Sequence, residues 1–302
     1  MAIDTSFIHG IIPPMITPID ENEKIDEKKF RDQVEFLIQG GCSGVLVFGS
    51  NGEFYVLDDD EMERGLKLAV DQAAGRVPIF FGIGAISTKK CIKLAKMALA
   101  NGAKAVSVLQ PMYIKPNSDE LFLHYKTIAD AVAPSPMLIY NNPGRAGYGL
   151  TADMVVKLND TCENIVGIKD TSGDMQMVEE IIRRTRHTNF RLLGGKDTLL
   201  FPTLVCGGYG GVCAVANSFP KLVCSIYDKY VAGDIKGALE AQYIMNPIRI
   251  SMDKSTFPVA AKAMCKVTGR DMGLPYLPTL EATSAGFEAI EKAIKETGYI
   301  EK

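Results

Sequence analysis

The sequence predicts an α/β protein, namely a (β/α)8 or TIM barrel followed by a small C-terminal helical region. Short apolar runs alternate with longer amphipathic segments, and the alternation repeats along residues 1–230. The apolar runs are continuous, which is typical of parallel strands buried on both faces. A repeat of this length has the usual size of a single barrel.

Eight strands and eight intervening helices can be placed on this pattern. The expected strands are Gly10–Met15, Gly44–Phe48, Val77–Gly82, Ala105–Val108, Met137–Tyr140, Ile165–Lys169, Arg191–Gly194 and Gly211–Ala214. The expected helices are Lys28–Gln39, Asp60–Ala74, Thr88–Asn101, Asp119–Ala133, Thr151–Asn159, Asp174–Thr185, Thr198–Cys206 and Pro220–Tyr230. Because Ser and Thr side chains cap helix N-termini, we expect caps at Thr88, Ser118 and Thr151.

An open, doubly wound sheet shares this alternation of strands and helices. Such a sheet normally carries a glycine-rich nucleotide-binding turn after its first strand. Here residues 13–18 read Pro-Pro-Met-Ile-Thr-Pro, with no glycine cluster. The barrel is therefore favoured over the open sheet.

The strand pattern stops after about residue 231. We expect helices at Asp234–Met245, Thr256–Thr268 and Thr283–Thr297, with breaks at Pro247, Pro275 and Pro278. We divide the chain into a catalytic barrel, residues 1–230, and a C-terminal helical region, residues 231–302. The second region is too short to bury much core alone, so we interpret it as an appendage of the barrel.

Composition excludes several classes of function. Of the 302 residues, 47% are hydrophobic and 23% charged, which excludes a mainly disordered chain. The net charge is −3 without a basic cluster, so we expect no nucleic-acid partner. The apolar runs are too short to cross a bilayer, and residues 1–10 lack a signal-peptide pattern. These features predict a cytoplasmic protein that does not bind membranes.

Cysteine and histidine usage gives no indication of a metal or a disulfide framework. The seven cysteines form no C-x-x-C pair, and most lie in apolar segments, as small buried hydrophobic side chains do. The three histidines have no ligand-like spacing. We expect no metal site and no cofactor.

In a barrel, reacting groups lie at the C-terminal ends of the strands, and Lys169 ends one of them. A lysine there can simply reach solvent or pair with Asp170. Two tyrosines, Tyr113 and Tyr140, and the Ser50-Asn51 turn are expected at the same end of the barrel, which favours imine chemistry. Burial would disfavour the ammonium form and free the amine to attack a carbonyl.

The other candidates have equally simple structural interpretations. Tyr140 could be an aromatic residue at the barrel rim, and Arg145 could be solvated. The turn Gly49–Gly52 could be only a tight loop, or its N–H groups could bind a carboxylate.

Together these residues resemble the dihydrodipicolinate synthase / N-acetylneuraminate lyase family of class I aldolases. Four motifs occur in the family's order and spacing, and the resemblance covers essentially the whole chain. The motifs are Gly49-Ser50-Asn51-Gly52-Glu53, Pro111-Met112-Tyr113, Tyr140-Asn141-Asn142-Pro143-Gly144-Arg145 and Gly167-Ile168-Lys169.

The resemblance implies catalytic roles residue by residue. Lys169 matches the lysine that forms the Schiff base with pyruvate, and Tyr140 matches the tyrosine that moves protons at the imine carbon and the new hydroxyl. Ser50 would relay protons between Tyr140 and Tyr113. Tyr113 matches a tyrosine that enters the neighbouring subunit's site, so we expect a homo-oligomer, a tetramer built as a dimer of dimers.

The resemblance also implies how substrates are bound. The Ser50 and Asn51 amides would hold the pyruvate carboxylate, and Gly195 and Val212 complete the predicted substrate-binding residues. Arg145 stands where the synthase binds the carboxylate of aspartate semialdehyde. The predicted partners are therefore pyruvate and an aldehyde.

Several functions within the family remain open. Arg145 favours the condensation of pyruvate with aspartate semialdehyde. Ser50-Asn51 and the segment 169–174 are more similar to 4-hydroxy-2-oxoglutarate aldolases, and a 2-keto-3-deoxy sugar-acid aldolase is a further alternative. Ile86, Lys90 and Met112 differ from the residues of lysine-inhibited synthases, so we expect no inhibition by lysine.

Two other classes of protein remain open. The glycine-rich segment 207–211 near the eighth strand could bind a phosphorylated substrate. Few cations that could bind a phosphate lie nearby, and Lys196 is the clearest of them. The second class is a catalytically silent homologue with a binding or regulatory role. The presence of Lys169, Tyr140 and Ser50 argues against this class.

Overall fold

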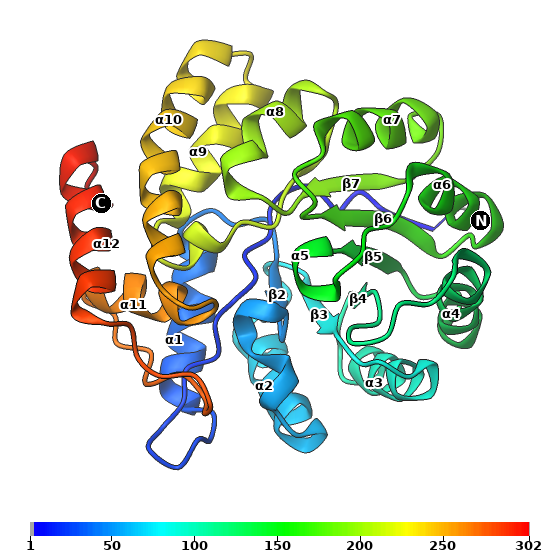
Figure 1. The fold of residues 1–302 in the computed structure, drawn as a ribbon, viewed down its shortest axis with the longest axis horizontal. Helices are drawn as coiled ribbons and strands as arrows, with labels where there is room; N and C mark the ends of the chain where they lie inside the picture. Colours follow the sequence, from blue (N-terminus) through cyan, green and yellow to red (C-terminus); the bar gives the residue numbers. More distant parts are fainter. Residues whose placement is uncertain (1–2, 302) are drawn as a thin grey trace.

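The computed structural model describes residues 3–301, and within them eight parallel strands form one curled sheet (Figure 1). Neighbouring strands pair in the order β1-β8-β7-β6-β5-β4-β3-β2. A parallel bridge between Pro14 and Leu46 joins the two outermost strands and closes the barrel. The strands are β1 (Gly10–Ile11), β2 (Val45–Val47), β3 (Ile79–Ile83), β4 (Ala105–Leu109), β5 (Met137–Asn141), β6 (Ile165–Asp170), β7 (Arg191–Gly194) and β8 (Gly210–Gly211).

Helices follow the strands and surround the sheet, so the predicted (β/α)8 barrel is confirmed (Figure 1). The helices of the barrel are α1 (Glu27–Gln39), α2 (Asp59–Ala73), α3 (Thr88–Ala100), α4 (Ser118–Val132), α5 (Pro143–Ala146), α6 (Ala152–Thr161), α7 (Met175–Thr185), α8 (Leu200–Val205) and α9 (Pro220–Val231). The later helices are α10 (Ile235–Ser251), α11 (Val259–Val267) and α12 (Ser284–Thr297).

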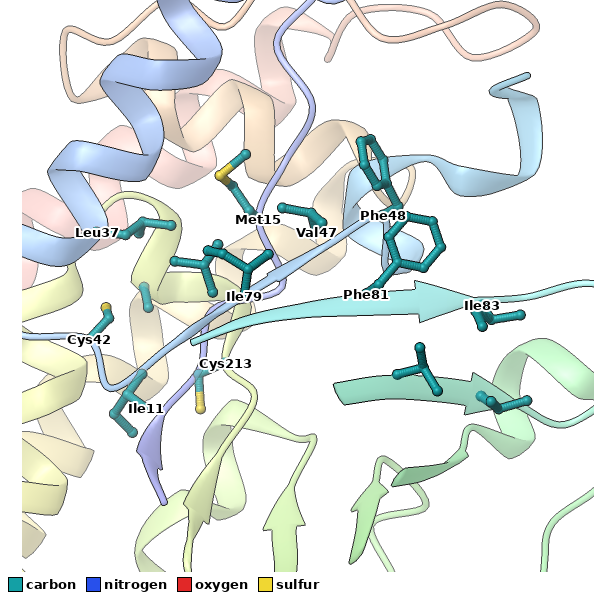
Figure 2. Close-up of a cluster of buried hydrophobic side chains, with 14 of the residues drawn as sticks. Ile11, Met15, Leu37, Cys42, Val47, Phe48, Ile79, Phe81, Ile83 and Cys213 are labelled. Atoms are coloured by element: carbon teal, nitrogen blue, oxygen red, sulfur yellow. The ribbon is translucent and has the colours of Figure 1, made fainter. Parts of the chain in front are cut away.

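The side chains on the two faces of the strands belong to two separate buried clusters. Because both faces are buried, the strand sequences are continuously apolar. In β5, Leu138 belongs to a cluster inside the barrel, whereas Met137 and Ile139 belong to the larger cluster between strands and helices. Figure 2 shows part of the larger cluster. Because side chains alternate along a strand, Tyr140 lies on the same face as Leu138 and points into the barrel. The same alternation directs Lys169 inward, one residue after Ile168 of the outer cluster.

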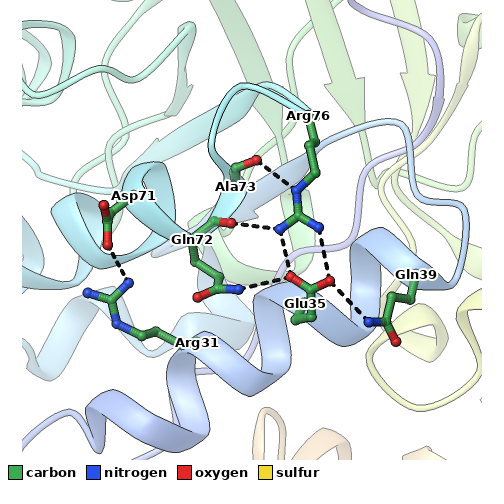
Figure 3. A network of polar contacts seen from close by, with 7 residues as sticks. All are labelled: Arg31, Glu35, Gln39, Asp71, Gln72, Ala73 and Arg76. Carbon is green, nitrogen blue, oxygen red and sulfur yellow. Dashed lines mark hydrogen bonds and ion pairs between the residues drawn. The ribbon is translucent and has the colours of Figure 1, made fainter.

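A network of polar side chains joins α1 to α2 on the outside of the barrel (Figure 3). Both guanidinium Nη atoms of Arg76 donate to the Glu35 carboxylate, at 2.6 and 2.9 Å, and Gln72 and Gln39 donate to the same group. These hydrogen bonds favour the ionised carboxylate and lower the pKa of Glu35 to about 2. The network therefore orients these neighbouring helices, although its exposure limits its contribution to stability.

Two of the three predicted helix caps were placed one residue too late. Ser87 and Asn117, rather than Thr88 and Ser118, occupy the N-cap positions, while Thr151 caps α6 as predicted. Asn117 forms a capping box with Glu120, in which each side chain accepts from the other residue's backbone N–H. In each wrong case an adjacent polar residue offered an equivalent cap, so composition alone could not place the boundary.

The predicted break at Pro247 is also wrong, because α10 continues through this residue to Ser251. Proline removes the hydrogen bond to the carbonyl four residues earlier, which belongs to Tyr243. Both residues lie on the exposed side of α10, where water can replace the lost bond. The segment that contains Pro275 and Pro278 is non-helical, as predicted.

The C-terminal helices gather beside the last barrel helix (Figure 1). Helix α10 packs against α9, and α12 packs against α10. The predicted division between residues 230 and 231 falls at the end of α9 and remains a prediction. Within residues 3–301, no helix combines the length and apolar character that a membrane span requires. All seven cysteines are free thiols, and six of them are buried.

Candidate active site

Lys169 and Tyr140 lie side by side because they are register partners on β6 and β5. The Lys169 Nζ atom is 4.1 Å from the centroid of the Tyr140 ring. Only 4% of Lys169 and 6% of Tyr140 is exposed. The structure thus places an amine and a phenol together in a nearly dry barrel interior, where a lysine can serve as a nucleophile.

Ser50 and Asn51 reach this group from a 3₁₀ turn, Ser50–Gly52, which is separated from the end of β2 by two residues. The turn is fixed to the loop that follows β1, since Thr17 Oγ1 of that loop donates to the Gly52 carbonyl at 2.7 Å. Ser50 and Asn51 are both buried, and the first N–H groups of such a turn have no partner within it. This is the arrangement that can bind a carboxylate.

The environment of Tyr140 lowers the pKa of its phenol. Burial alone would raise the pKa of Tyr140, but the neighbouring Lys169 charge and hydrogen bonding from Ser50 and Asn142 lower it below its ordinary value. Asn142 Nδ2 donates to the phenolic oxygen at 2.8 Å. The Thr171 hydroxyl also approaches Tyr140, although without the geometry of a hydrogen bond. Tyr140 is therefore suited to exchanging protons.

Asp170 does not pair with Lys169, which was the simpler alternative considered for this lysine. The Asp170 carboxylate accepts from Asn141 Nδ2 and from Ser172 Oγ, both at 2.6 Å. Burial raises the pKa of Asp170. Within the described residues, Lys169 forms no ion pair, so no carboxylate is bound to its Nζ atom.

Arg145 lies farther out, on the short helix α5 that follows β5. It lines a pocket of about 220 Å³ whose wall also includes Ser50. Its guanidinium lies 4.4 Å from the centroid of the Phe257 ring. Among residues 3–301, no acidic side chain forms an ion pair with Arg145, so it can bind an anionic group that enters the pocket.

Gly195 follows β7, which is paired with the strand of Lys169, and Val212 follows β8, the next strand in the sheet. Gly195 N–H donates to the Asp170 carbonyl, and a Cβ at this position would lie 2.1 Å from Thr171 Oγ1, so only glycine fits. Val212 is buried inside the barrel. The structure therefore places both at the strand ends around the lysine.

Tyr113 is the one predicted site residue that the chain does not bring to this group. It is 95% exposed and has a φ of 71°, an uncommon backbone conformation for a residue with a side chain. The role of Tyr113 therefore remains a prediction.

Sequence reasoning missed the contacts around Asn142, Gln110 and Asp170. The Gln110 and Asp170 side chains form one hydrogen-bonded network with Asn141 at the ends of β4, β5 and β6, and the Asn142 backbone N–H joins it by donating to Gln110. Each of these residues ends or follows an apolar run, so the rule that selected Lys169 could have found them. For the described residues, no group of three or more His, Cys, Asp or Glu side chains is arranged to hold a metal ion.

A parallel (β/α)8 barrel with a buried lysine at a strand end is the arrangement of class I aldolases, which form a Schiff base on such a lysine. The chain belongs to the dihydrodipicolinate synthetase family, whose model matches residues 7–297. Members of this family are lyases and aldolases that use pyruvate, and this chain is one of these enzymes.

Relatives of this chain cover nearly its whole length. It is 34% identical to the 4-hydroxy-tetrahydrodipicolinate synthase of Methanopyrus kandleri, over 97% of each chain. It is 35% identical to the enzyme of that name from Geotalea uraniireducens, over 96% of this chain and 99% of the relative.

Solved structures agree with this relationship. Dihydrodipicolinate synthase from Aquifex aeolicus matches with a TM-score of 0.92 and 30% identity, over 96% of this chain and 98% of that one. YagE, a prophage protein of the family from E. coli K12 solved in complex with pyruvate, matches with a TM-score of 0.92 and 27% identity, over 96% and 99%.

Proposed function

We propose that this enzyme binds pyruvate as a Schiff base on Lys169 and joins it to aspartate semialdehyde. The observation that carries the proposal is the position of Lys169, buried without an ion-pair partner and next to the Tyr140 phenol. A buried lysine that lies beside a phenol is the arrangement that imine formation requires.

In the proposed reaction, Lys169 Nζ attacks the C2 carbonyl of pyruvate. The attacking amine and Tyr140 each give one proton to the C2 oxygen, which leaves as water and yields the protonated imine. The Tyr140 phenolate then removes a C3 proton, and the resulting enamine attacks the aldehyde carbon through C3. Tyr140 protonates the resulting alkoxide, and Ser50 returns protons to Tyr140. The Ser50-Asn51 turn holds the pyruvate carboxylate throughout.

Arg145 supports aspartate semialdehyde as the second substrate. Its guanidinium lines the outer pocket, which also contacts Ser50, and it lacks an acidic partner among the described residues. A carboxylate on the incoming aldehyde could form two parallel hydrogen bonds with it. The relatives described above are named 4-hydroxy-tetrahydrodipicolinate synthase, which supports the same substrate.

A coupled assay with pyruvate tests this choice. The candidate aldehydes are aspartate semialdehyde, glyoxylate as the partner released from 4-hydroxy-2-oxoglutarate, and glyceraldehyde as the partner released from 2-keto-3-deoxygluconate. We expect the highest kcat/KM with aspartate semialdehyde. Undetectable activity with it, together with turnover of either other aldehyde, would contradict the synthase proposal and favour the corresponding aldolase.

We further propose that the active enzyme is a cytoplasmic homotetramer, a dimer of dimers in which Tyr113 completes a partner's site. The nearly complete exposure of Tyr113 supports this arrangement. A tyrosine that protrudes in this way is stabilised when a second subunit covers it.

A further inference from the structure

The phenolic oxygen of Tyr140 has a partner that the proposed reaction does not use. Asn142 Nδ2 donates to it at 2.8 Å. The two residues are separated by one position at the end of β5, so their side chains project to the same side of the strand. Asn142 is buried, as Tyr140 is.

Asn142 is itself fixed by the neighbouring strand end. Its backbone N–H donates to Gln110 Oε1 at 3.0 Å. Gln110 Nε2 in turn donates to the Tyr148 carbonyl at 3.0 Å and to Asn141 Oδ1 at 3.2 Å. Asn142 therefore meets Tyr140 from a defined position rather than from a mobile loop.

The direction of this hydrogen bond has a consequence for the proton of Tyr140. An amide N–H only donates, so the phenolic oxygen accepts from Asn142 and its own proton must point elsewhere. The other neighbours of that oxygen are Ser50 and Thr171, and Lys169 is the charged group that faces the ring. The proton is thus directed away from Asn142 toward the reacting side of the barrel.

We propose that Asn142 is a positioning residue that orients the Tyr140 hydroxyl and stabilises its ionised form. The role rests on the proposed function, because it matters to turnover only if Tyr140 moves protons for a Schiff base on Lys169. Loss of the donor destabilises the phenolate relative to the phenol, so the pKa of Tyr140 rises.

The test compares Asn142→Leu and Asn142→Asp with the parent enzyme. Leucine keeps the approximate size and removes the donor, whereas aspartate keeps the shape and brings a negative charge to the phenolate. We expect kcat to fall roughly tenfold in Asn142→Leu, the effect of one hydrogen bond, with a smaller change in the KM for pyruvate. The pH limb that reports Tyr140 moves to higher pH in both variants, and farther in Asn142→Asp.

Titration of ¹³Cζ-labelled tyrosine by NMR measures the pKa of Tyr140 without relying on activity. The Tyr140→Phe variant identifies its resonance. In a Tyr140→Phe background, Asn142→Leu should cause no further loss of turnover, because the two residues act through one bond. Asn189→Leu, an exposed asparagine ahead of β7, serves as the control and should leave the titration unchanged.

The outcomes separate the two proposals. An unchanged Tyr140 pKa and pH profile in both Asn142 variants, while pyruvate is still trapped on Lys169, overturns the role of Asn142 alone. Additive losses in the double variant overturn it as well, because they indicate a general structural effect. If the parent enzyme does not trap pyruvate on Lys169, the proposed function itself fails, and the role in turnover fails with it.

Discussion

The chemistry of single residues in this enzyme depends on the neighbours that the barrel gives them. Lys169 and Tyr140 are adjacent because parallel strands bring register partners together at the strand ends. Burial removes water from both side chains, and the charge of Lys169 shifts Tyr140 toward ionisation. Burial and the effect of a neighbouring charge both depend on residues that are distant in the sequence. Lys169 and Tyr140, taken singly, could therefore be interpreted either as catalytic or as ordinary side chains at the barrel rim.

Replacement of Tyr140 by phenylalanine tests its assignment as the proton carrier. The ring and its contact with Lys169 remain, but the hydroxyl is lost. We expect turnover to fall by roughly 10²–10⁴, the usual contribution of a positioned acid or base. Steady-state kinetics measure this effect, and a rate near that of the parent enzyme would remove Tyr140 from the mechanism.

Arg145 should affect the second substrate and leave the first untouched. Arg145→Ala should lower kcat/KM for aspartate semialdehyde by about one to two powers of ten, because charge-assisted hydrogen bonds contribute roughly 1.5–3 kcal/mol. Arg145→Lys should recover little, since lysine cannot bind a carboxylate bidentately.

The comparison aldehyde for these variants is glyceraldehyde, which carries no carboxylate. Its turnover should change much less, and trapping of pyruvate on Lys169 should stay close to the parent level. Equal losses with both aldehydes would mean that Arg145 supports the pocket rather than the substrate.

At the scale of elements, the turn after β2 is held by a helix from the C-terminal region. Glu53, the last residue of the motif that contains Ser50, forms an ion pair with Lys262 of α11 at 2.8 Å, and both side chains are at least 96% buried. Glu53 Oε1 also accepts from the Tyr276 N–H, and Lys262 donates to the Leu274 carbonyl. The C-terminal helices thus fix the position of the carboxylate-binding turn.

Loss of Lys262 should therefore damage both stability and the site. Lys262→Met leaves the Glu53 carboxylate buried without its partner, and we expect the free energy of unfolding to fall by about 3–5 kcal/mol. Restoring neutrality with Glu53→Gln in the same chain should recover part of that loss. Urea unfolding measures the stability, and the KM for pyruvate should rise as the turn loosens.

Lys266 provides a matched control, one turn further along α11. It pairs with Glu281 in solvent, where an ion pair contributes about 0–1 kcal/mol. Lys266→Met should therefore be nearly neutral. Equal effects of the Lys262 and Lys266 substitutions would contradict the role assigned to the buried pair.

Most elements could be predicted from the sequence because both faces of most strands are apolar and most helices are amphipathic. The short elements could not. The 3₁₀ turn at Ser50 and the helix α5 that carries Arg145 have only three and four residues, so no periodicity develops within them. They are shaped by contacts with distant segments, such as Thr17 with Gly52. Most predicted residues of the site lie close together, with Tyr113 outside the group, but the elements that orient them were not predictable.

At the scale of the whole molecule, the barrel completes most of the proposed site within one chain and leaves Tyr113 outside it. The motif order was enough to select Lys169, Tyr140 and Ser50, since the ends of parallel strands meet at one face of a barrel. Contacts such as Glu53 with Lys262 were not accessible in this way, because they join segments more than two hundred residues apart with no shared pattern.

Mixed oligomers test whether Tyr113 acts in a partner's site. We expect Lys169→Ala and Tyr113→Phe chains to be weakly active or inactive alone. If subunits exchange and Tyr113 crosses the interface, a mixed dimer contains one site with both intact residues, and activity reappears on mixing. Coexpressed, purified mixtures give the measurement. No recovery in mixed dimers verified by native mass spectrometry would contradict the arrangement.

The most direct test of the account is to identify the residue that binds pyruvate covalently. The enzyme is incubated with pyruvate, reduced with borohydride and analysed by peptide mass spectrometry, with Lys169→Ala as the control. We expect one reduced pyruvate per chain, on Lys169, and no label in the variant while its circular dichroism spectrum stays that of the parent. A label on another lysine, or an active enzyme that takes up no label, would contradict the account.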